Sequence, residues 1–192
     1  MLAASLPTIP KIQINKPRNT FCVTQNKRQQ LTLFADKKDS EEIEKIRKRF
    51  NPKQSELIDC HVTLCREDEI KNIDKVLDNL STLDQQAVTI QFDQVATFDN
   101  GKGVLIPATD DNREFYQLRE KVLKGLDIAS IRQQEPHITL MHPRNSTCTD
   151  EIFDTIKKAN LPTHLTFKTV SLIELVDGGQ WQILKIFDLQ SS

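Results

Sequence analysis

A short pattern, His-x-Thr followed by an apolar residue, occurs in both halves of this 192-residue chain, as HVTL at 61–64 and HITL at 137–140. Successive side chains of a β-strand point to opposite faces, so the histidine and the threonine of each copy share one face. The apolar residues between and after them share the other. We therefore expect two strands that are anchored in a core and present an imidazole and a hydroxyl on their free faces.

The segments around the two patterns are also alike, which indicates an internal repeat. Each half reads as a strand, a helix, the His-Thr strand and a second helix. Leu31 lies 30 positions before His61, and Val104 lies 33 positions before His137. We predict an α+β, bilobal fold with two antiparallel β-sheets flanked by helices, in which a pseudo-two-fold relation brings the two His-Thr strands to one cleft.

The periodicity of apolar residues places the individual elements and the boundaries of the fold. Residues 1–29 hold three prolines and no sustained period, and are predicted to be an N-terminal tail or peripheral arm. Residues 30–192 are predicted to be a single bilobal domain, with a first repeat at about 30–98 and a second at about 103–189. Strands are expected at 30–35, 57–65, 87–98, 104–108, 137–142, 163–176 and 181–189, and helices at 40–50, 67–80, 112–123 and 150–159.

Composition limits the function classes. Apolar residues make up 38% and charged residues 28%, with a net charge of −1, which is typical of a soluble domain without an electrostatic grip on long nucleic acid. No apolar run approaches the roughly 20 residues of a membrane span. The N-terminus lacks the pattern of a secretory signal, and the four cysteines form no CxxC pair, so we expect reduced thiols and a cytoplasmic protein. A monomer is also expected, although the sequence has no feature that determines the oligomeric state.

Paired imidazoles and hydroxyls suit chemistry on a phosphate. Histidine has an ordinary pKa of about 6.5, so one copy can act as a general base and the other as a general acid, with a bell-shaped pH profile near neutrality. A threonine hydroxyl on the same face can hold a phosphoryl oxygen during in-line attack. This chemistry requires no metal and no cofactor.

The pattern alone is weak, because a third copy, HLTF, occurs at 164–167. His164 is not preceded by the strand-helix unit that precedes the other two, so we predict that it is not functional. His142 falls on the face opposite to His137 by strand alternation, which favours a role in packing or capping.

Other candidates have two readings each. Arg66 and Arg144 follow the two motifs and either contact phosphate at the cleft rim or are solvated charges at strand ends. Lys102 lies in a Gly-Lys-Gly turn, which favours an exposed turn residue over a phosphate contact. Tyr116 and Trp181 could stack a base, but both are predicted to belong to the core.

Metal binding is the main competing chemistry. Cys60, His61 and Cys65 are close in sequence, yet Cys60 and His61 point to opposite faces, and Cys65 shares the face of His61. No second cluster supplies the remaining ligands, so no metal site is predicted. The acids at 67–69 are interpreted as the first turn of the helix at 67–80.

The duplicated motif, HVTL and HITL in register with the two predicted lobes, resembles the hallmark of the two-histidine (2H) phosphoesterase superfamily, and within it the 2′-5′ RNA ligase-like proteins. The resemblance runs from about Gln30 to Leu189. It implies metal-independent action on 2′,3′-cyclic phosphates or 2′-5′ phosphodiesters of nucleotides or RNA ends. By position, His61 and His137 would be the acid-base pair, and Thr63 and Thr139 the phosphate-binding hydroxyls. Which histidine is the acid stays open.

We favour hydrolysis of a cyclic phosphate over ligation, because transfer to water requires only one bound substrate. The alternatives are 2′-5′ RNA ligase activity, a nucleotide-binding module without turnover, and an interaction domain with incidental motifs. The relative position of the two histidines decides between the enzyme and the last of these.

Overall fold

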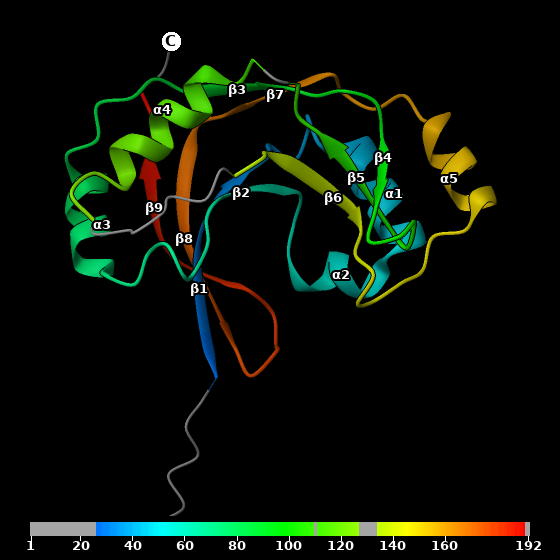
Figure 1. Cartoon of the computed structure of the whole chain (residues 1–192), viewed down its shortest axis with the longest axis horizontal. Coiled ribbons are helices and arrows are strands. Elements are labelled where there is room, and N and C mark those ends of the chain that lie inside the picture. The colour runs from blue at the N-terminus through cyan, green and yellow to red at the C-terminus, as the bar shows by residue number, and fades with distance from the viewer. Residues whose placement is uncertain (1–25, 110, 127–133, 191–192) are drawn as a thin grey trace, which may run out of the picture.

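The computed structural model describes residues 26–109, 111–126 and 134–190, which form nine strands and five helices (Figure 1). The predicted tail at 1–29 lies mostly outside the described residues. The strands are β1 (Lys27–Phe34), β2 (His61–Cys65), β3 (Val88–Gln91), β4 (Ala96–Phe98), β5 (Gly103–Pro107), β6 (His137–Met141), β7 (His164–Phe167), β8 (Thr169–Val176) and β9 (Gln182–Asp188). The helices are α1 (Glu41–Phe50), α2 (Pro52–Leu57), α3 (Ile73–Ser81), α4 (Arg113–Val122) and α5 (Asp150–Lys157).

The strands form antiparallel sheets, which confirms the predicted α+β class. One sheet has the order β2-β1-β8-β9, a second the order β4-β5-β6, and β3 pairs with β7. An antiparallel bridge between Phe92 and Ala108 links the two smaller sheets. The sequence predicts two sheets, and the hydrogen bonding gives three, of which the two smaller ones are joined by this bridge.

The internal repeat extends to the strand pairing. In the first half β1 pairs with β2, and Phe34 is opposite His61. In the second half β5 pairs with β6, and Pro107 is opposite His137. Each motif strand is therefore held by the strand that begins its own half.

Both motif strands carry a β-bulge at the same position. Between Thr63 and Cys65 the register advances two residues in β2 and only one in β1, so Leu64 is the extra residue. Leu140 is the extra residue in β6. The bulge turns Cys65 and Met141 into the core, where both are 0% exposed. The prediction that Cys65 shares the face of the first histidine is therefore wrong.

The apolar residues of the motif strands anchor them in one shared core. Val62, Leu64, Ile138 and Leu140 are each at most 1% exposed and belong to a single buried cluster from both halves. Such burial stabilises by roughly 1.5–3 kcal/mol per side chain. The histidines and threonines of the same strands stay partly exposed.

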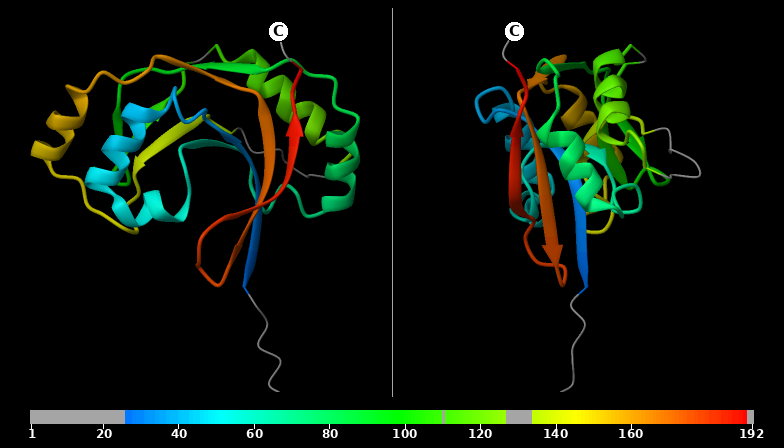
Figure 2. Two further views of the ribbon diagram at one scale, coloured as in Figure 1. Left: turned by 180° about the vertical axis from the view of Figure 1, so that it is seen from behind. Right: turned by 90° about the vertical axis from the view of Figure 1, so that its left-hand side faces the viewer.

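The helices tie the two halves together. Helix α1, from the first half, contacts β6, and α4, from the second half, contacts β2 and β3. Figure 1 shows α3 and α4 on one side of the central strands β2 and β6, and α1, α2 and α5 on the other. From behind and from the side, the start of β1 and the turn between β8 and β9 extend together beyond the rest of the molecule (Figure 2). Among the described residues, no helix has both the length and the apolar character needed to cross a bilayer.

Two predicted strands are each divided between sheets. The segment predicted at 87–98 forms β3 and β4, which belong to different ladders. The segment predicted at 163–176 breaks at Lys168 into β7 and β8. The apolar alternation is interrupted at each break, by the step from Phe92 to Val95 in the first segment and from Phe167 to Val170 in the second, which is the sequence sign of the change of partner.

The helix predicted at 67–80 begins later, at Ile73. Residues before it form a turn in which the Glu69 carboxylate accepts the backbone N–H of Arg66 at 2.8 Å. Helix α2 was not predicted, and β1 begins at Lys27, two residues before the predicted end of the tail at residue 29. The division into a tail and one domain otherwise stays a prediction.

Candidate active site

The two motif strands line one cavity of about 680 Å³, which we call the cleft. It is polar, and it is lined by both histidines and both threonines of the duplicated motif together with side chains from β1, α1, α2 and the two loops that follow β2 and β6. The lining residues are Arg28, Gln30, Arg47, Gln54, Leu57, Ile58, His61, Thr63, Arg66, Glu67, Asp68, His137, Thr139, His142, Arg144, Asn145, Leu175, Gly178 and Trp181.

The two histidines are oriented by equivalent hydrogen bonds. Nδ1 of His61 lies 2.8 Å from the carbonyl oxygen of Asp59, and Nδ1 of His137 lies 2.8 Å from the carbonyl oxygen of Glu135. A carbonyl oxygen only accepts, so each Nδ1 carries a proton and donates it. The Nε2 atoms are left to exchange protons with a bound molecule.

His61 is neutral at neutral pH. Burial in the cleft lowers the pKa of His61 to about 4, against the opposing effect of the Asp59 carbonyl, and the positive charges of Arg47 and of a protonated His137 act in the same direction as burial. With its proton on Nδ1, the neutral ring has a free lone pair on Nε2. His61 therefore has the form of a general base.

The threonine hydroxyls share the cleft with the histidines. Thr63 and Thr139 follow their histidines by two residues and are partly exposed within it. The strand geometry thus delivers two imidazoles and two hydroxyls to one cavity. The arrangement can bind a phosphoryl group and move protons on two sides of it.

The bulges bring the residues that follow each motif into the cleft. Arg66, Arg144 and His142 all line it. His142 was predicted on the opposite face, and the bulge at Leu140 reverses that. Its Nδ1 accepts the backbone N–H of Arg144 at 3.1 Å, so it also caps the turn, and burial together with the charge of Arg144 lowers its pKa.

One wall of the cleft comes from the β1–β8 side of the large sheet. Trp181, predicted to be a core residue, is partly exposed there, and its backbone N–H donates to the Leu57 carbonyl at 3.0 Å. The guanidinium of Arg28 lies 5.8 Å from the Trp181 ring centre and forms a 2.7 Å ion pair with Glu67. Arg28 is not among the predicted site residues because it falls in the predicted tail. The sequence holds no alternation there, because residues 27–30 (KRQQ) are all polar.

At the rim, Asn145 donates from Nδ2 to Oε1 of Gln54 at 2.8 Å, which links α2 to the loop after β6. Neither residue was among the candidates, because α2 was not predicted. The bond joins the two halves of the chain beside the cleft.

Three other candidates lie elsewhere, and none is among the described residues that line the cleft. Tyr116 packs against the core with its ring at right angles to that of Phe115. Lys102 is exposed in the turn between β4 and β5. His164 is exposed in β7, and the hydroxyl of Thr166 bonds to that of Thr89 at 2.9 Å.

The cysteines near His61 are buried. Burial raises the pKa of the Cys60 and Cys65 thiols to about 12, which keeps both protonated at neutral pH. Within the described part of the chain, no group of three or more His, Cys, Asp or Glu side chains converges to hold a metal ion.

Glu69 is a buried ion-pair residue and not a first-turn acid of a helix. It is 4% exposed, and its Oε1 lies 2.5 Å from Nη2 of Arg119, which is also 4% exposed. Nη1 of Arg119 donates to the Leu64 carbonyl at 2.5 Å. The pair thus fixes the end of β2 from helix α4.

The family model described as the 2′-5′ RNA ligase superfamily matches residues 35–179, which includes both motifs. The chain belongs to the 2′-5′ RNA ligase superfamily. This confirms the resemblance to the 2H phosphoesterases. No curated protein sequence matches the chain.

Solved structures share the superfamily fold at low sequence identity. E. coli LigT complexed with NADP+ is 17% identical, with a TM-score of 0.62 over 85% of this chain and 98% of that one. E. coli LigT complexed with 3′-AMP is 16% identical, with the same TM-score and coverage. TT0787 of Thermus thermophilus is 15% identical, with a TM-score of 0.54 over 86% of this chain and 99% of that one. These likenesses show the fold.

Proposed function

We propose that this protein is a metal-independent phosphoesterase that acts on 2′,3′-cyclic phosphates or 2′-5′ phosphodiesters of nucleotides or RNA ends. The observation that carries the proposal is the pair of imidazoles in one cavity, each with Nδ1 bound to a backbone carbonyl and with no hydrogen bond at Nε2 from the residues that the structure describes. Membership of the 2′-5′ RNA ligase superfamily supports it.

In the proposed reaction, Nε2 of His61 takes a proton from water, and the water oxygen forms a bond to phosphorus in line with the leaving oxygen. The bond from phosphorus to the 2′ or 3′ oxygen breaks, and His137 gives its Nε2 proton to that oxygen. A nucleoside monophosphate is the product. After the step His61 carries a proton on Nε2 and His137 has lost its own, so the two histidines have exchanged protonation states.

The hydroxyls of Thr63 and Thr139 would donate to the non-bridging phosphoryl oxygens, where negative charge accumulates. Arg66 and Arg144 would offset the charge of the phosphate. The hydroxyls act only through short-range hydrogen bonds. The arginines lie on the loops after the motif strands, and their positive charges act on the phosphate over a longer distance.

A nucleotide is the proposed substrate class. Structures of E. coli LigT with ATP, NADP+ and 3′-AMP support nucleotide binding by this fold. The cleft adds a tryptophan and several arginines beside the phosphate-binding groups. We infer hydrolysis over ligation because transfer to water requires only one bound substrate. A cytoplasmic location and a monomeric state stay predictions.

The test is a screen of the four 2′,3′-cyclic nucleotides and of 2′-5′-linked dinucleotides, in the presence of EDTA, with His61→Ala and His137→Ala beside the wild type. We expect turnover that EDTA does not reduce, and a loss of roughly 10²–10⁴-fold in each variant. Binding of nucleoside monophosphates without turnover would indicate a binding module. Full activity in either variant would exclude the paired mechanism.

A further inference from the structure

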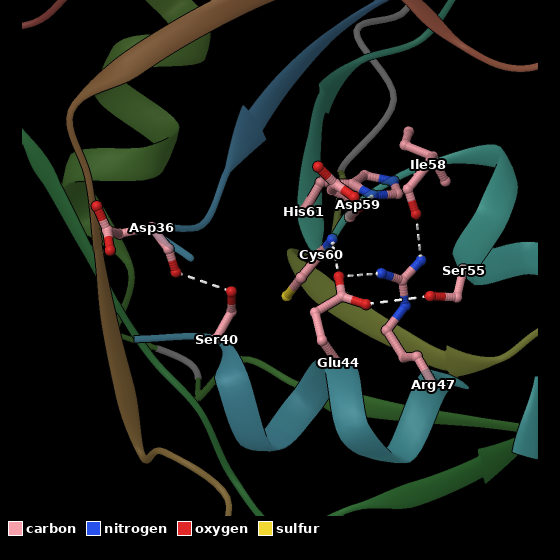
Figure 3. A network of polar contacts seen from close by, with 9 residues as sticks. All are labelled: Asp36, Ser40, Glu44, Arg47, Ser55, Ile58, Asp59, Cys60 and His61. Carbon is pink, nitrogen blue, oxygen red and sulfur yellow. Dashed lines mark hydrogen bonds and ion pairs between the residues drawn. The ribbon is translucent and has the colours of Figure 1, made fainter. Parts of the chain in front are cut away.

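The peptide group between Asp59 and Cys60 connects His61 to a carboxylate on helix α1. Its carbonyl oxygen accepts the Nδ1 proton of His61 at 2.8 Å, and its N–H donates to Oε1 of Glu44 at 2.5 Å. A trans peptide is planar, with its C=O and N–H pointing in opposite directions. The three groups therefore form one continuous chain from the imidazole to the carboxylate (Figure 3).

Glu44 is itself held firmly in this position. Nη1 of Arg47 lies 2.5 Å from Oε1 of Glu44, and the Ser55 hydroxyl donates to Oε2 at 3.2 Å. Nη2 of Arg47 donates to the Ile58 carbonyl at 2.6 Å, so the same guanidinium also binds the loop that leads to His61. Arg47 is 2% exposed, and because it lies on α1 together with Glu44, the helix fixes the positions of both charged side chains relative to the loop.

The second half of the molecule lacks this connection. Nδ1 of His137 donates to the carbonyl of Glu135, whose peptide group continues into Pro136. Proline has no N–H, so this peptide group has nothing to donate to a carboxylate. Both histidines thus donate to a backbone carbonyl, but only the carbonyl of Asp59 belongs to a peptide group with an N–H that donates to a carboxylate.

We propose that Glu44 is a positioning residue for His61, acting through the Asp59–Cys60 peptide group, and that Arg47 keeps Glu44 in place. An N–H that donates to a carboxylate makes the carbonyl of the same peptide a stronger acceptor. The carbonyl then holds the proton of His61 on Nδ1 and fixes the direction of Nε2, as carboxylates do directly for histidines in other sites. This inference rests on the proposed function for its kinetic consequence, and it makes His61 the better supported proton acceptor of the pair.

The kinetic test uses Glu44→Gln, which keeps the shape of the side chain and removes its charge. We expect kcat on a 2′,3′-cyclic nucleotide to fall roughly tenfold, with KM changed by less than about twofold, because Glu44 lies behind the peptide group and not against the substrate. The matched control is Glu42→Gln, which removes a carboxylate from the exposed side of the same helix, where it pairs with Lys45. Its kcat is expected to equal that of the wild type.

The second readout is the tautomer of each histidine, measured by ¹⁵N NMR of the full chain at neutral pH. In the wild type we expect the His61 proton on Nδ1. In Glu44→Gln we expect a mixture of tautomers at His61 and no change at His137. Should Glu44→Gln fail to fold, the double variant Glu44→Gln/Arg47→Met, which leaves no buried charge at this position, carries the same two measurements.

The proposal is overturned if the His61 tautomer in the folded variant equals that of the wild type, whether or not kcat falls. It is also overturned if kcat of an active enzyme is unchanged. A wild type that turns over no substrate would refute the proposed function alone, because the NMR measurement still tests the connection to Glu44.

Discussion

The ring of Phe34 lies 6.1 Å from the ring of His61, centroid to centroid, and the two residues face each other in the register of β1 and β2. The rings are tilted by 59°, so an apolar side chain covers part of the imidazole. His137 faces Pro107 in the equivalent position. This apolar neighbour is one source of the burial that lowers the pKa of His61 to about 4.

We therefore expect the acid limb of the pH profile of kcat/KM near pH 4, below the neutral range expected from the sequence. A general base acts in its neutral form, which is lost as the pH falls through the pKa. Activity supported by His61 should be complete well above pH 4 and disappear below it. Phe34→Ala should move this limb upward, toward the ordinary histidine value of about 6.5. A wild-type limb near the ordinary value would contradict the assignment of His61 as the base.

The third His-x-Thr copy offers an internal control for the threonines. Thr63→Val and Thr139→Val keep the side-chain volume and remove the hydroxyl, so we expect kcat/KM to fall about a hundredfold in each. Thr166→Val should have wild-type kcat/KM, because Thr166 bonds to Thr89 in the β3–β7 ladder. Equal losses in all three variants would show that the hydroxyls act on folding and not on the phosphate.

The buried Glu69–Arg119 pair predicts a specific pattern of stability. Arg119→Met leaves the Glu69 carboxylate buried without its guanidinium partner, and we expect the free energy of unfolding to fall by about 3–5 kcal/mol. Adding Glu69→Gln to the same chain should recover a large part of the loss. Urea unfolding of the wild type, the single variant and the double variant measures this. A double variant no more stable than Arg119→Met would argue that the arginine acts mainly through the Leu64 carbonyl.

Trp181 should affect binding more than turnover. A base stacked on an aromatic ring contributes roughly 1–3 kcal/mol, so Trp181→Ala is expected to raise the KM for cyclic nucleotides about tenfold with a smaller change in kcat. Tyr116→Ala, which alters the only tyrosine of the chain, is the matched control and should leave KM unchanged in the folded protein, since Tyr116 packs against the core. An unchanged KM in Trp181→Ala would place the base elsewhere.

The sequence predicted the repeat, the fold class and the motif strands because alternation and spacing are local signals. Val62, Leu64, Ile138 and Leu140 are buried as their positions require. The bulge at Leu64 has no such signal, because an inserted residue changes the direction in which later side chains point without changing the residue types. Arg66 and His142 therefore line the cleft because of the bulges, which the pattern of alternating residues does not predict.

The buried ion pairs could not be predicted from the sequence, for a different reason. Glu69 and Arg119 are 50 residues apart, and each looks like an ordinary surface charge of a polar segment. Glu44 and Arg47 are three residues apart on a predicted helix, but their burial depends on the loop that α2 and β2 fold against them. Partners of this kind are determined by tertiary packing, which a single sequence does not reveal.

The imino acid at Pro136 gives this duplicated molecule a direction. A cyclic phosphate could be placed between two nearly identical walls in either orientation, yet only one wall has a backbone amide hydrogen available for a carboxylate behind it. Water should then always approach from the wall of the first half, and the leaving ribose oxygen should always face the other wall. The absence of one amide hydrogen, at Pro136, would thus decide in which orientation the substrate binds.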